Sequence, residues 1–433
     1  MKELIDSFIQ EALGHDPASW PMTQGAYVLA VLVLGLVVTV CGALFAGAVS
    51  WWERRIAARM QSRIGPNRVG PQGVLQFLAD ALKLILKEDL IPEDSDHILF
   101  RLAPYFVLTG FVLTFVVLPF GYGVAATDMN IGLFYLVSVT ALGVVGILMS
   151  GWSSNSKWAL FGGIRAAAQV VSYEIPAGLA LLVPITMAGT LSMQGIIRAQ
   201  GGNPWDWFMF QTPWGFAAFF ILFVALLAEG NRTPFDLPEA ESELVAGYNT
   251  EYSGIRFGYY LLAEWGNLWV MSATLVTLFL GGWQVPGVSA ATIASWEAHG
   301  GYSLWFIHEL PAPGWFYLVS VAVFALKALV LLNVVIWIRW TLPRIRVDQM
   351  MSLCWKYLVP AGMVLVVLAA LTEWGSFTVF GDAARVQAPL SSPRGLLHLG
   401  FFAVAGALPL LLFLSKTFKN IRLTGERVDL TNW

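Results

Sequence analysis

Nine apolar runs, each long enough to cross a lipid bilayer as a helix, constrain this chain more than any other feature. They cover residues 25–51, 98–120, 131–152, 171–192, 214–230, 258–282, 316–338, 355–373 and 396–415. A run of about 20 apolar residues spans the hydrocarbon core, because a helix rises about 1.5 Å per residue. Hydrophobic residues make up 57% of the 433 residues and charged residues 12%, which is typical of multi-spanning membrane proteins. The pattern therefore predicts an all-α polytopic membrane protein.

The distribution of Lys and Arg between the loops predicts the orientation of the chain in the membrane. Twenty of these residues lie in or beside the segments on one side: 52–97, 153–170, 231–257, 339–356 and the tail from Lys416. The opposite side holds four, namely Lys2, Arg198, Arg385 and Arg394. Because loops rich in Lys and Arg stay in the cytoplasm, we expect the N-terminus outside and the C-terminus in the cytoplasm.

A loop rich in carboxylates, residues 229–257, separates the fifth and sixth runs. Its acidic residues are Glu229, Asp236, Glu239, Glu241, Glu243 and Glu251. Asp236, Pro238 and Glu239 have the spacing of a helix N-cap, a first-turn proline and a capping box. Like charges this close raise one another's pKa where water is excluded, so such a group can take up and release protons. A solvated acidic loop with a well-capped helix explains the spacing alone equally well.

The segment 52–97, which follows the first run, carries a basic amphipathic pattern. It combines apolar residues at every fourth position with arginines on another face: Trp52, Ile56, Met60 and Ile64, and Arg55, Arg59 and Arg63. This spacing predicts an amphipathic helix in the membrane interface, although an anchor that only fixes the topology would show it too. The glycine- and proline-rich loop 65–73 then turns the chain, and a second surface helix is expected at residues 74–87.

Few charged residues interrupt the apolar runs, so each is a candidate for function. Glu174 begins the fourth run and Glu229 ends the fifth. Glu264 lies near the start of the sixth run and Lys327 in the middle of the seventh. An ammonium group at that depth costs several kcal/mol unless it is paired or hydrated, so we expect a carboxylate or water beside Lys327. Inter-helix ion pairs would explain each charge separately, whereas all four together with the acidic loop indicate a polar path.

The residue types that bind redox cofactors are scarce in this chain. It has two cysteines, Cys41 and Cys354, and five scattered histidines. An iron–sulfur cluster needs four thiolates, and the histidines lack the paired spacing of a metal or haem site. No GxGxxG or Walker loop follows a predicted strand, so nucleotide binding is not expected either. Any redox chemistry should therefore be carried by other subunits.

Three long motifs stand out in the sequence: ERRIAARMQSRIGPNRVGPQGVLQFLADALKLILKED at 53–89, SYEIPAGLALL at 172–182 and NRTPFDLPEAESELVAGYNTEYSG at 231–254. They resemble the H subunit, a membrane subunit of bacterial NADH:quinone oxidoreductase, respiratory complex I. The resemblance covers residues 25–372 and implies an eight-helix core that anchors a peripheral redox arm to the cell inner (cytoplasmic) membrane. It implies three regions: an external segment at 1–24, the membrane domain shared with the family at 25–373, and an external loop, ninth transmembrane helix and cytoplasmic tail at 374–433.

The resemblance also implies roles for individual residues. The interfacial helix should border the entrance of a quinone chamber shared with peripheral subunits, through Trp52, Arg54, Arg55, Ile56, Arg59, Met60 and Arg63. The residues expected to connect the chamber to a proton path are Glu174, Glu229, Asp236, Glu239, Glu241, Glu243, Glu251 and Glu264, with Lys327 as a further candidate. Quinone is the expected substrate, and NADH, FMN and iron–sulfur clusters are expected in partner subunits. No metal or nucleic acid is expected on this chain.

Some features depart from the family pattern. Gly230 replaces a threonine, and Asn249 stands where histidine or an aromatic residue is usual. The external loops 283–315 and 374–395 and the ninth run exceed the common core. Two alternatives remain: the anchor subunit of a membrane-bound hydrogenase, and a freestanding proton-coupled transporter. The complete acidic loop ending in YNTEYSG favours the quinone-reducing relatives, and the chain lacks the internal repeats with broken helices that a transporter should show.

Overall fold

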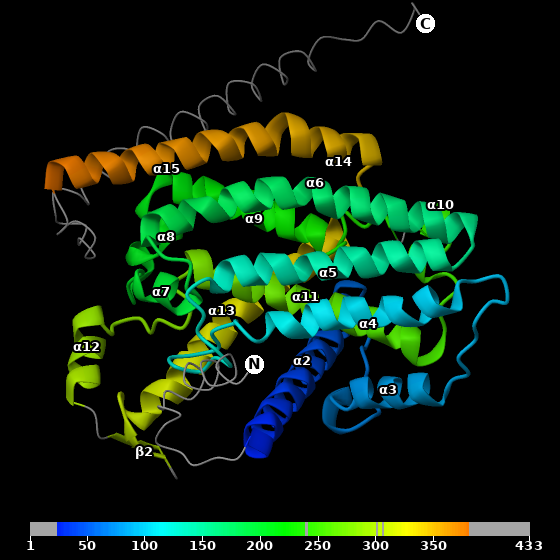
Figure 1. Ribbon diagram of the computed structural model, residues 1–433, viewed down its shortest axis with the longest axis horizontal. Coiled ribbons are helices and arrows are strands. Elements are labelled where there is room, and N and C mark those ends of the chain that lie inside the picture. The colour runs from blue at the N-terminus through cyan, green and yellow to red at the C-terminus, as the bar shows by residue number, and fades with distance from the viewer. Residues whose placement is uncertain (1–23, 239–240, 300–301, 305–306, 381–433) are drawn as a thin grey trace, which may run out of the picture.

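A computed structural model describes residues 24–238, 241–299, 302–304 and 307–380 of the 433. These residues form a bundle of long helices that run back and forth between two ends (Figure 1). We call one end the acidic-loop end, because the loop at residues 230–253 lies there, and the other the far end. In Figure 1 the acidic-loop end is on the right and the far end is on the left.

Long helices make up the bundle. In chain order they are α2 (Gln24–Met60), α4 (His97–Thr114), α5 (Gly132–Ser153), α6 (Lys157–Ala188), α9 (Pro213–Glu229), α11 (Gly254–Phe279), α13 (Gly314–Thr341) and α15 (Val359–Phe380). α14 (Val347–Leu353) and a π-helical turn (Cys354–Leu358) lead directly into α15. Within the described ranges, six helices are long and apolar enough to cross a membrane, and α9 is a shorter apolar helix. The architecture is therefore that of a helical membrane protein.

Short elements join the long helices at both ends. The acidic-loop end has α3 (Gln76–Leu86), α10 (Glu241–Leu244) and the 3₁₀ turns Pro71–Gly73 and Gly247–Asn249. The far end has α7 (Met193–Arg198), a 3₁₀ turn (Pro204–Asp206), α8 (Phe208–Gln211) and α12 (Ala290–His299). An antiparallel hairpin of β1 (Tyr302–Leu304) and β2 (Ile307–Leu310) follows α12. This hairpin is a small departure from the all-α prediction.

Each of the first eight predicted apolar runs lies largely within a helix, and six of these helices are long and apolar enough to cross a membrane, which confirms the helical membrane fold. α15 continues to Phe380, beyond the predicted end of the eighth run at residue 373. The ninth predicted run, 396–415, lies outside the described residues, as do the external segment up to residue 23 and the tail.

The start of the fourth run was predicted too late. α6 begins at Lys157, so most of the predicted loop 153–170 is helical and Glu174 lies in the middle of the helix. A hydropathy pattern places the start of a span after the last charged residue. Arg165 nevertheless lies within the helix, because its side chain extends to a half-exposed position where it binds Glu243. Pro176 and Pro184 lie inside α6, where packed neighbouring helices make the lost backbone hydrogen bond tolerable.

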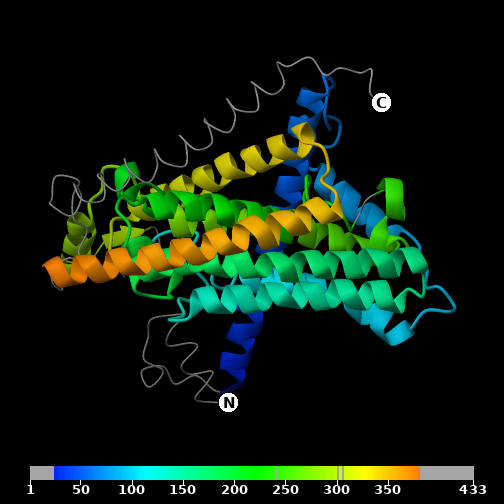
Figure 2. The ribbon, with the colours of Figure 1, turned by 90° about the horizontal axis from the view of Figure 1, so that it is seen from above.

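The predicted boundary between the first span and an interfacial helix is also wrong. α2 continues without a break from Gln24 to Met60, so residues 52–60 are its last turns rather than a separate helix. No glycine or proline interrupts residues 48–60, and these are the residues that most often end or kink a helix. Figure 2 shows the first half of α2 projecting from the bundle, whereas its last turns lie close to α3 and α13.

α11 lies at the centre of the bundle and positions the interior polar residues. From Leu268 to Phe279 every one of its residues is buried. Near its middle, Gly266 lets α4 approach, because a Cβ atom there would lie 2.1 Å from the ring of Phe111. The close approach of α4 and α11 forms one wall of an internal cavity.

Apolar side chains cover the outside of the bundle, as expected for contact with lipid. Exposed tryptophans gather toward the two ends: Trp152, Trp158, Trp337, Trp340 and Trp355 toward the acidic-loop end, and Trp205 and Trp315 toward the far end. Tryptophan is enriched where a membrane meets water, because its ring is apolar and its N–H is polar. These two groups are consistent with a bilayer that surrounds the bundle between its ends.

Candidate functional site: an internal cavity joined to a buried ion cluster

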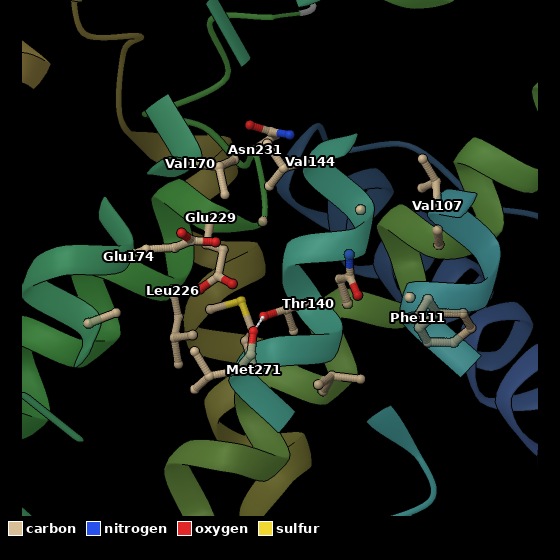
Figure 3. Close-up of a pocket in the computed structure, with 18 of the residues that line it drawn as sticks. Val107, Phe111, Thr140, Val144, Val170, Glu174, Leu226, Glu229, Asn231 and Met271 are labelled. Atoms are coloured by element: carbon tan, nitrogen blue, oxygen red, sulfur yellow. Dashed lines mark hydrogen bonds between the residues drawn. The ribbon is translucent and has the colours of Figure 1, made fainter. Parts of the chain in front are cut away.

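A cavity of about 110 Å³ lies inside the bundle between α4, α5, α6, α9 and α11 (Figure 3). One water needs roughly 10–15 Å³ measured in this way, so the cavity has room for several. Most of its wall is apolar, but it also contains polar side chains: Thr140, Glu174, Glu229, Asn231, Tyr248, Tyr260, Glu264, Asn267 and Thr274. The cavity is therefore a hydratable polar chamber within a membrane helix bundle.

Three of the predicted carboxylates line this cavity, each from a different helix. Glu174 comes from the middle of α6, Glu229 from the last residue of α9 and Glu264 from α11. Figure 3 shows the side chains of Glu174 and Glu229 next to each other at the cavity wall, with Thr140 of α5 across from them. Three residues far apart in the sequence therefore meet around one hydratable space.

A buried ion cluster adjoins the cavity at the acidic-loop end. Its centre is Arg232, whose side chain is only 1% exposed. Arg232 Nη1 lies 3.0 Å from Glu264 Oε1 and 3.6 Å from Glu53 Oε2. The guanidinium of Arg339 binds the other carboxylate oxygen of Glu53. We call Glu53, Arg232, Glu264 and Arg339 the ion cluster; it ties together α2, the acidic loop, α11 and α13.

Glu264 belongs to both features. Its carboxylate binds Arg232 in the ion cluster, and its side chain also lines the cavity. A change in the charge of the cluster therefore acts directly on a carboxylate of the cavity.

Asp236 lies beside the ion cluster rather than at a helix start. Its Oδ2 is 3.4 Å from Arg344 Nη2, in the segment between α13 and α14. Burial raises the pKa of Asp236, and the guanidiniums of Arg344, Arg339 and Arg232 partly offset this. The predicted capping of a helix by Asp236 is not seen, because the two residues that follow it, 237–238, are not helical.

Of the other predicted carboxylates of the acidic loop, the described side chains of Glu243 and Glu251 do not line the cavity. Glu243 is exposed and binds Arg165 Nη1 at 2.6 Å. Glu251 is half-buried in the turn before α11. Glu239 and the side chain of Glu241 lie outside the described part of the chain. Glu243 therefore pairs with an arginine, and this contact does not support the idea that Glu243 faces other carboxylates.

A buried glutamine fixes the start of the acidic loop. Gln169 of α6 is fully buried, and its Nε2 lies 2.7 Å from the carbonyl oxygens of Ala228 and Phe235 and 3.2 Å from Asn231 Oδ1. A second close contact lies one to two turns earlier in α6, where a Cβ on Gly162 would lie 2.7 Å from Gly247. These contacts hold residues 228–235, and with them Glu229 and Arg232, against α6.

Lys327 has a different environment from the one predicted. Its Nζ lies 2.8, 3.0 and 3.2 Å from the carbonyl oxygens of Leu280, Gly282 and Gln284. It also lies 4.3 Å from the centre of the Trp207 ring. The ammonium therefore satisfies the carbonyl groups that follow the C-terminus of α11 at the far end, which is a favourable place for a cation. Of the carboxylate or water predicted beside Lys327, no carboxylate is among its contacts in the described residues.

The seven residues predicted at a quinone entrance lie on the last turns of α2 and just beyond. Trp52 Nε1 donates to Asn333 Oδ1 of α13 at 3.0 Å. Arg54 Nη1 binds Asp80 of α3 at 2.5 Å. The others are half-buried or exposed: Arg55, Ile56, Arg59, Met60 and Arg63. These contacts fix the last turns of α2 against α3 and α13.

Sequence reasoning missed several residues of the site. They are Glu53, Arg232 and Arg339 in the ion cluster, Arg344 beside Asp236, and Gln169 behind the loop. All lie at or beyond the edges of the predicted apolar runs, where a charge reads as an ordinary loop residue. Glu53 and Arg339 are 286 positions apart, so only the fold reveals that they form a pair.

Comparison with known proteins assigns the family. The family model described as NADH dehydrogenase matches residues 32–370. The H subunit of the NADH-quinone oxidoreductase of Anaeromyxobacter dehalogenans is 57% identical over 98% of both chains. The chain belongs to the family of NADH-quinone oxidoreductase H subunits. This membership confirms the resemblance seen in the three motifs and does not favour a hydrogenase anchor or a freestanding transporter.

Two other relatives match about four fifths of the chain. The H subunit of Chlorobium luteolum is 47% identical over 79% of this chain and 89% of its own. The H subunit of Chlorobaculum tepidum is 47% identical over 80% of this chain and 93% of its own. Members of this family are membrane subunits of an oxidoreductase, and the apolar helices described above agree with a membrane location.

Proposed function

We propose that this chain is the membrane subunit in which quinone reduction by an NADH-quinone oxidoreductase is coupled to proton translocation. The observation that carries the proposal is the double role of Glu264, which belongs to the ion cluster and also lines the cavity. A carboxylate shared in this way transmits a charge change on one side to proton-holding groups on the other.

The proposed mechanism begins at the last turns of α2. Quinone enters a chamber that partner subunits complete, beside Trp52, Arg54, Arg55, Ile56, Arg59, Met60 and Arg63. Reducing a quinone to a quinol consumes two electrons and two protons, so negative charge develops in the chamber until protons arrive. The ion cluster begins at Glu53, only one residue beyond Trp52 on the same helix turn. Its arginines are therefore placed to respond to that charge.

The response reaches the cavity through Arg232. When negative charge in the chamber attracts Arg232, its hold on Glu264 weakens, and Glu264 becomes a better proton acceptor. Neighbouring carboxylates in a secluded hydratable space exchange protons readily through water, so Glu264, Glu229 and Glu174 form the proposed proton path. Asp236, Glu239, Glu241, Glu243 and Glu251 are proposed to surround its entry from the acidic loop. Lys327 is proposed to stabilise the far end of α11 by binding the carbonyl groups there.

The wider assembly follows from the same proposal. Electrons reach quinone from FMN and iron–sulfur clusters in partner subunits, and residues 25–373 form an eight-helix core that anchors them. The acidic-loop end faces the cytoplasm, and the far end with α12 lies outside the inner membrane. With Cys41 and Cys354 replaced by serine, a membrane-impermeant thiol reagent added outside should label Ser289→Cys and not Asp94→Cys. The reverse labelling would overturn the orientation.

Purifying the assembly that contains this chain tests the proposed function. We expect it to oxidise NADH with a quinone as acceptor and to acidify one side of a sealed vesicle during turnover. Purification with a nickel–iron enzyme that evolves hydrogen, or of the chain alone, would contradict the proposal.

Gln169→Met should lower quinone reduction by the assembled complex about tenfold. The carbonyl groups of Ala228 and Phe235 would lose their hydrogen-bond donor, which costs roughly 1–3 kcal/mol of stability for each buried group. The start of the acidic loop would then be held less firmly. The matched control is Gln200→Met, which removes an equally buried glutamine at the far end. Both variants should lower the thermal unfolding midpoint, but only Gln169→Met should lower the quinone rate of complexes that remain assembled. Equal rates in both variants would show that Gln169 does not position the site.

A further inference from the structure

Tyr260 places an unusual hydroxyl at the wall of the cavity. The residue lies in α11, is 3% exposed and lines the cavity. Its hydroxyl is buried and lies near the hydroxyls of Tyr252 and Ser150, but it makes no well-formed hydrogen bond to a protein atom in the described ranges. A buried hydroxyl without a protein partner is normally satisfied by water, and the adjoining cavity has room for it. The Tyr260 hydroxyl is therefore positioned to exchange a proton with cavity water.

A second tyrosine continues from Tyr260 toward the acidic-loop end. Tyr252, just before α11, has its ring 5.1 Å from that of Tyr260, and the two hydroxyls are neighbours. The Tyr252 ring stacks on Phe100 with 4.1 Å between the ring centres and 2° between the planes. This stacking fixes the position of the ring, so only the hydrogen of the hydroxyl is free to rotate. Burial raises the pKa of Tyr252, so its hydroxyl stays protonated at neutral pH.

A third hydroxyl brings the series to the edge of the protein. The Tyr252 hydroxyl donates to Phe100 O at 3.3 Å and lies 3.5 Å from Ser153 Oγ. Ser153 is the last residue of α5, and its carbonyl oxygen accepts from the backbone N–H of Asp96 at 3.0 Å. Asp96 is exposed. Ser153 therefore lies next to an exposed residue at the acidic-loop end, and its hydroxyl, which donates to Ser150 O at 3.3 Å, is the outermost of the series.

We propose that Ser153, Tyr252 and Tyr260 form a hydroxyl relay through which the cavity takes up protons from the acidic-loop side. The proposal rests on the proposed function, because it supplies protons to the same carboxylates. In each step a hydroxyl accepts a proton from the preceding group and gives its own proton to the next. One proton enters at Ser153 and one leaves from Tyr260 to cavity water. Each hydroxyl therefore loses one O–H bond and gains another, and the relay returns to its starting state once the hydroxyls have reoriented.

Aromatic rings pack against one another beside Tyr260 at the cavity wall. Phe100, Tyr248, Tyr252 and Tyr260 pack closely in this part of the bundle, with Tyr248 and Tyr260 5.5 Å apart. All four side chains are nearly fully buried. Tightly packed rings exclude a continuous column of water, whereas their hydroxyls still allow a proton to pass.

Substitution by phenylalanine tests the relay without removing a ring. Tyr252→Phe keeps the stack on Phe100, and Tyr260→Phe keeps the contacts with Tyr248 and Tyr252. The measured quantities are quinone reduction and proton translocation by the complex in vesicles, in H₂O and in D₂O. We expect both rates to fall about tenfold, because loss of a positioned proton-transfer group slows the step that it serves. We also expect a larger solvent isotope effect than in the unaltered complex, which a purely structural role would not produce.

Two further variants complete the test. Tyr105→Phe removes the hydroxyl of a half-exposed tyrosine on α4 and should leave rates and isotope effect unchanged. Ser153→Ala removes the outermost hydroxyl without altering a ring and should reproduce the Tyr252→Phe result. Normal rates and isotope effects in Tyr252→Phe, Tyr260→Phe and Ser153→Ala, while Glu229→Gln stops translocation, would overturn the relay and leave the proposed function standing. Normal translocation in Glu229→Gln would overturn the proposed function itself.

Discussion

Arg232→Met should abolish quinone reduction while NADH oxidation by a soluble artificial acceptor continues in the complexes that assemble. The substitution leaves Glu53 and Glu264 buried without their shared cation. Removing one partner of a buried ion pair costs about 3–5 kcal/mol, because the remaining charge is uncompensated. A free-energy cost of that size lowers the population of the native arrangement of the site roughly a hundredfold or more. The quinone-dependent rate and the thermal unfolding midpoint should both fall.

A second substitution separates stability from function in this cluster. Adding Glu264→Gln to Arg232→Met removes one of the two carboxylates that lost Arg232 and should restore part of the lost stability, because an unpaired buried charge keeps its full desolvation cost. Quinone reduction coupled to proton movement should not return, since Glu264 itself is lost. Arg198→Met, which breaks the exposed pair with Glu297, is the matched control and should change stability by about 1 kcal/mol or less. Normal quinone turnover in Arg232→Met would contradict the proposed role of the ion cluster.

Glu229→Gln should lower coupled quinone reduction about a hundredfold, because a carboxylate that transfers protons is replaced by a neutral amide of the same shape. Glu229 lines the cavity next to Glu174, so its loss interrupts the path between Glu174 and Glu264 (Figure 3). Glu229→Asp keeps an ionisable group and should recover part of the rate.

The matched control for this prediction is Glu93→Gln, an exposed carboxylate at the same end of the protein. It should leave quinone reduction unchanged. In all three variants, NADH oxidation by a soluble acceptor should stay normal, because the peripheral arm is not altered. If Glu229→Gln reduced quinone as fast as Glu93→Gln, the cavity would not be part of the coupling path.

The helical architecture could be predicted from sequence because the bilayer restricts spanning segments to long apolar helices. Glu174, Glu229 and Glu264 were singled out by the rule that charged residues in apolar runs are candidates for function, although Glu174 lies in the middle of its helix rather than at the start. The start of α6 was missed because Arg165 lies within the helix and extends to its surface. The continuity of α2 was missed because a change from apolar to basic composition looks like a boundary, although no residue there breaks the helix.

The composition of the site could not be predicted in full, because its contacts join distant parts of the chain. Arg232 looked like a loop residue, yet it is among the most buried side chains described. A carboxylate or water was expected beside Lys327, whereas backbone carbonyl groups at the end of α11 accept hydrogen bonds from its ammonium group. Pairing of this kind depends on where α2, α11 and α13 meet, and no local spacing encodes that geometry.

The most direct measurement is the number of protons translocated per NADH oxidised by the purified complex in sealed proteoliposomes, with and without Glu264→Gln. The unaltered complex should translocate protons with quinone as the acceptor. Glu264→Gln should lose translocation, because the connection between the ion cluster and the cavity is removed. A normal proton-to-NADH ratio at a normal rate in Glu264→Gln would contradict the coupling of quinone reduction to proton movement through this carboxylate.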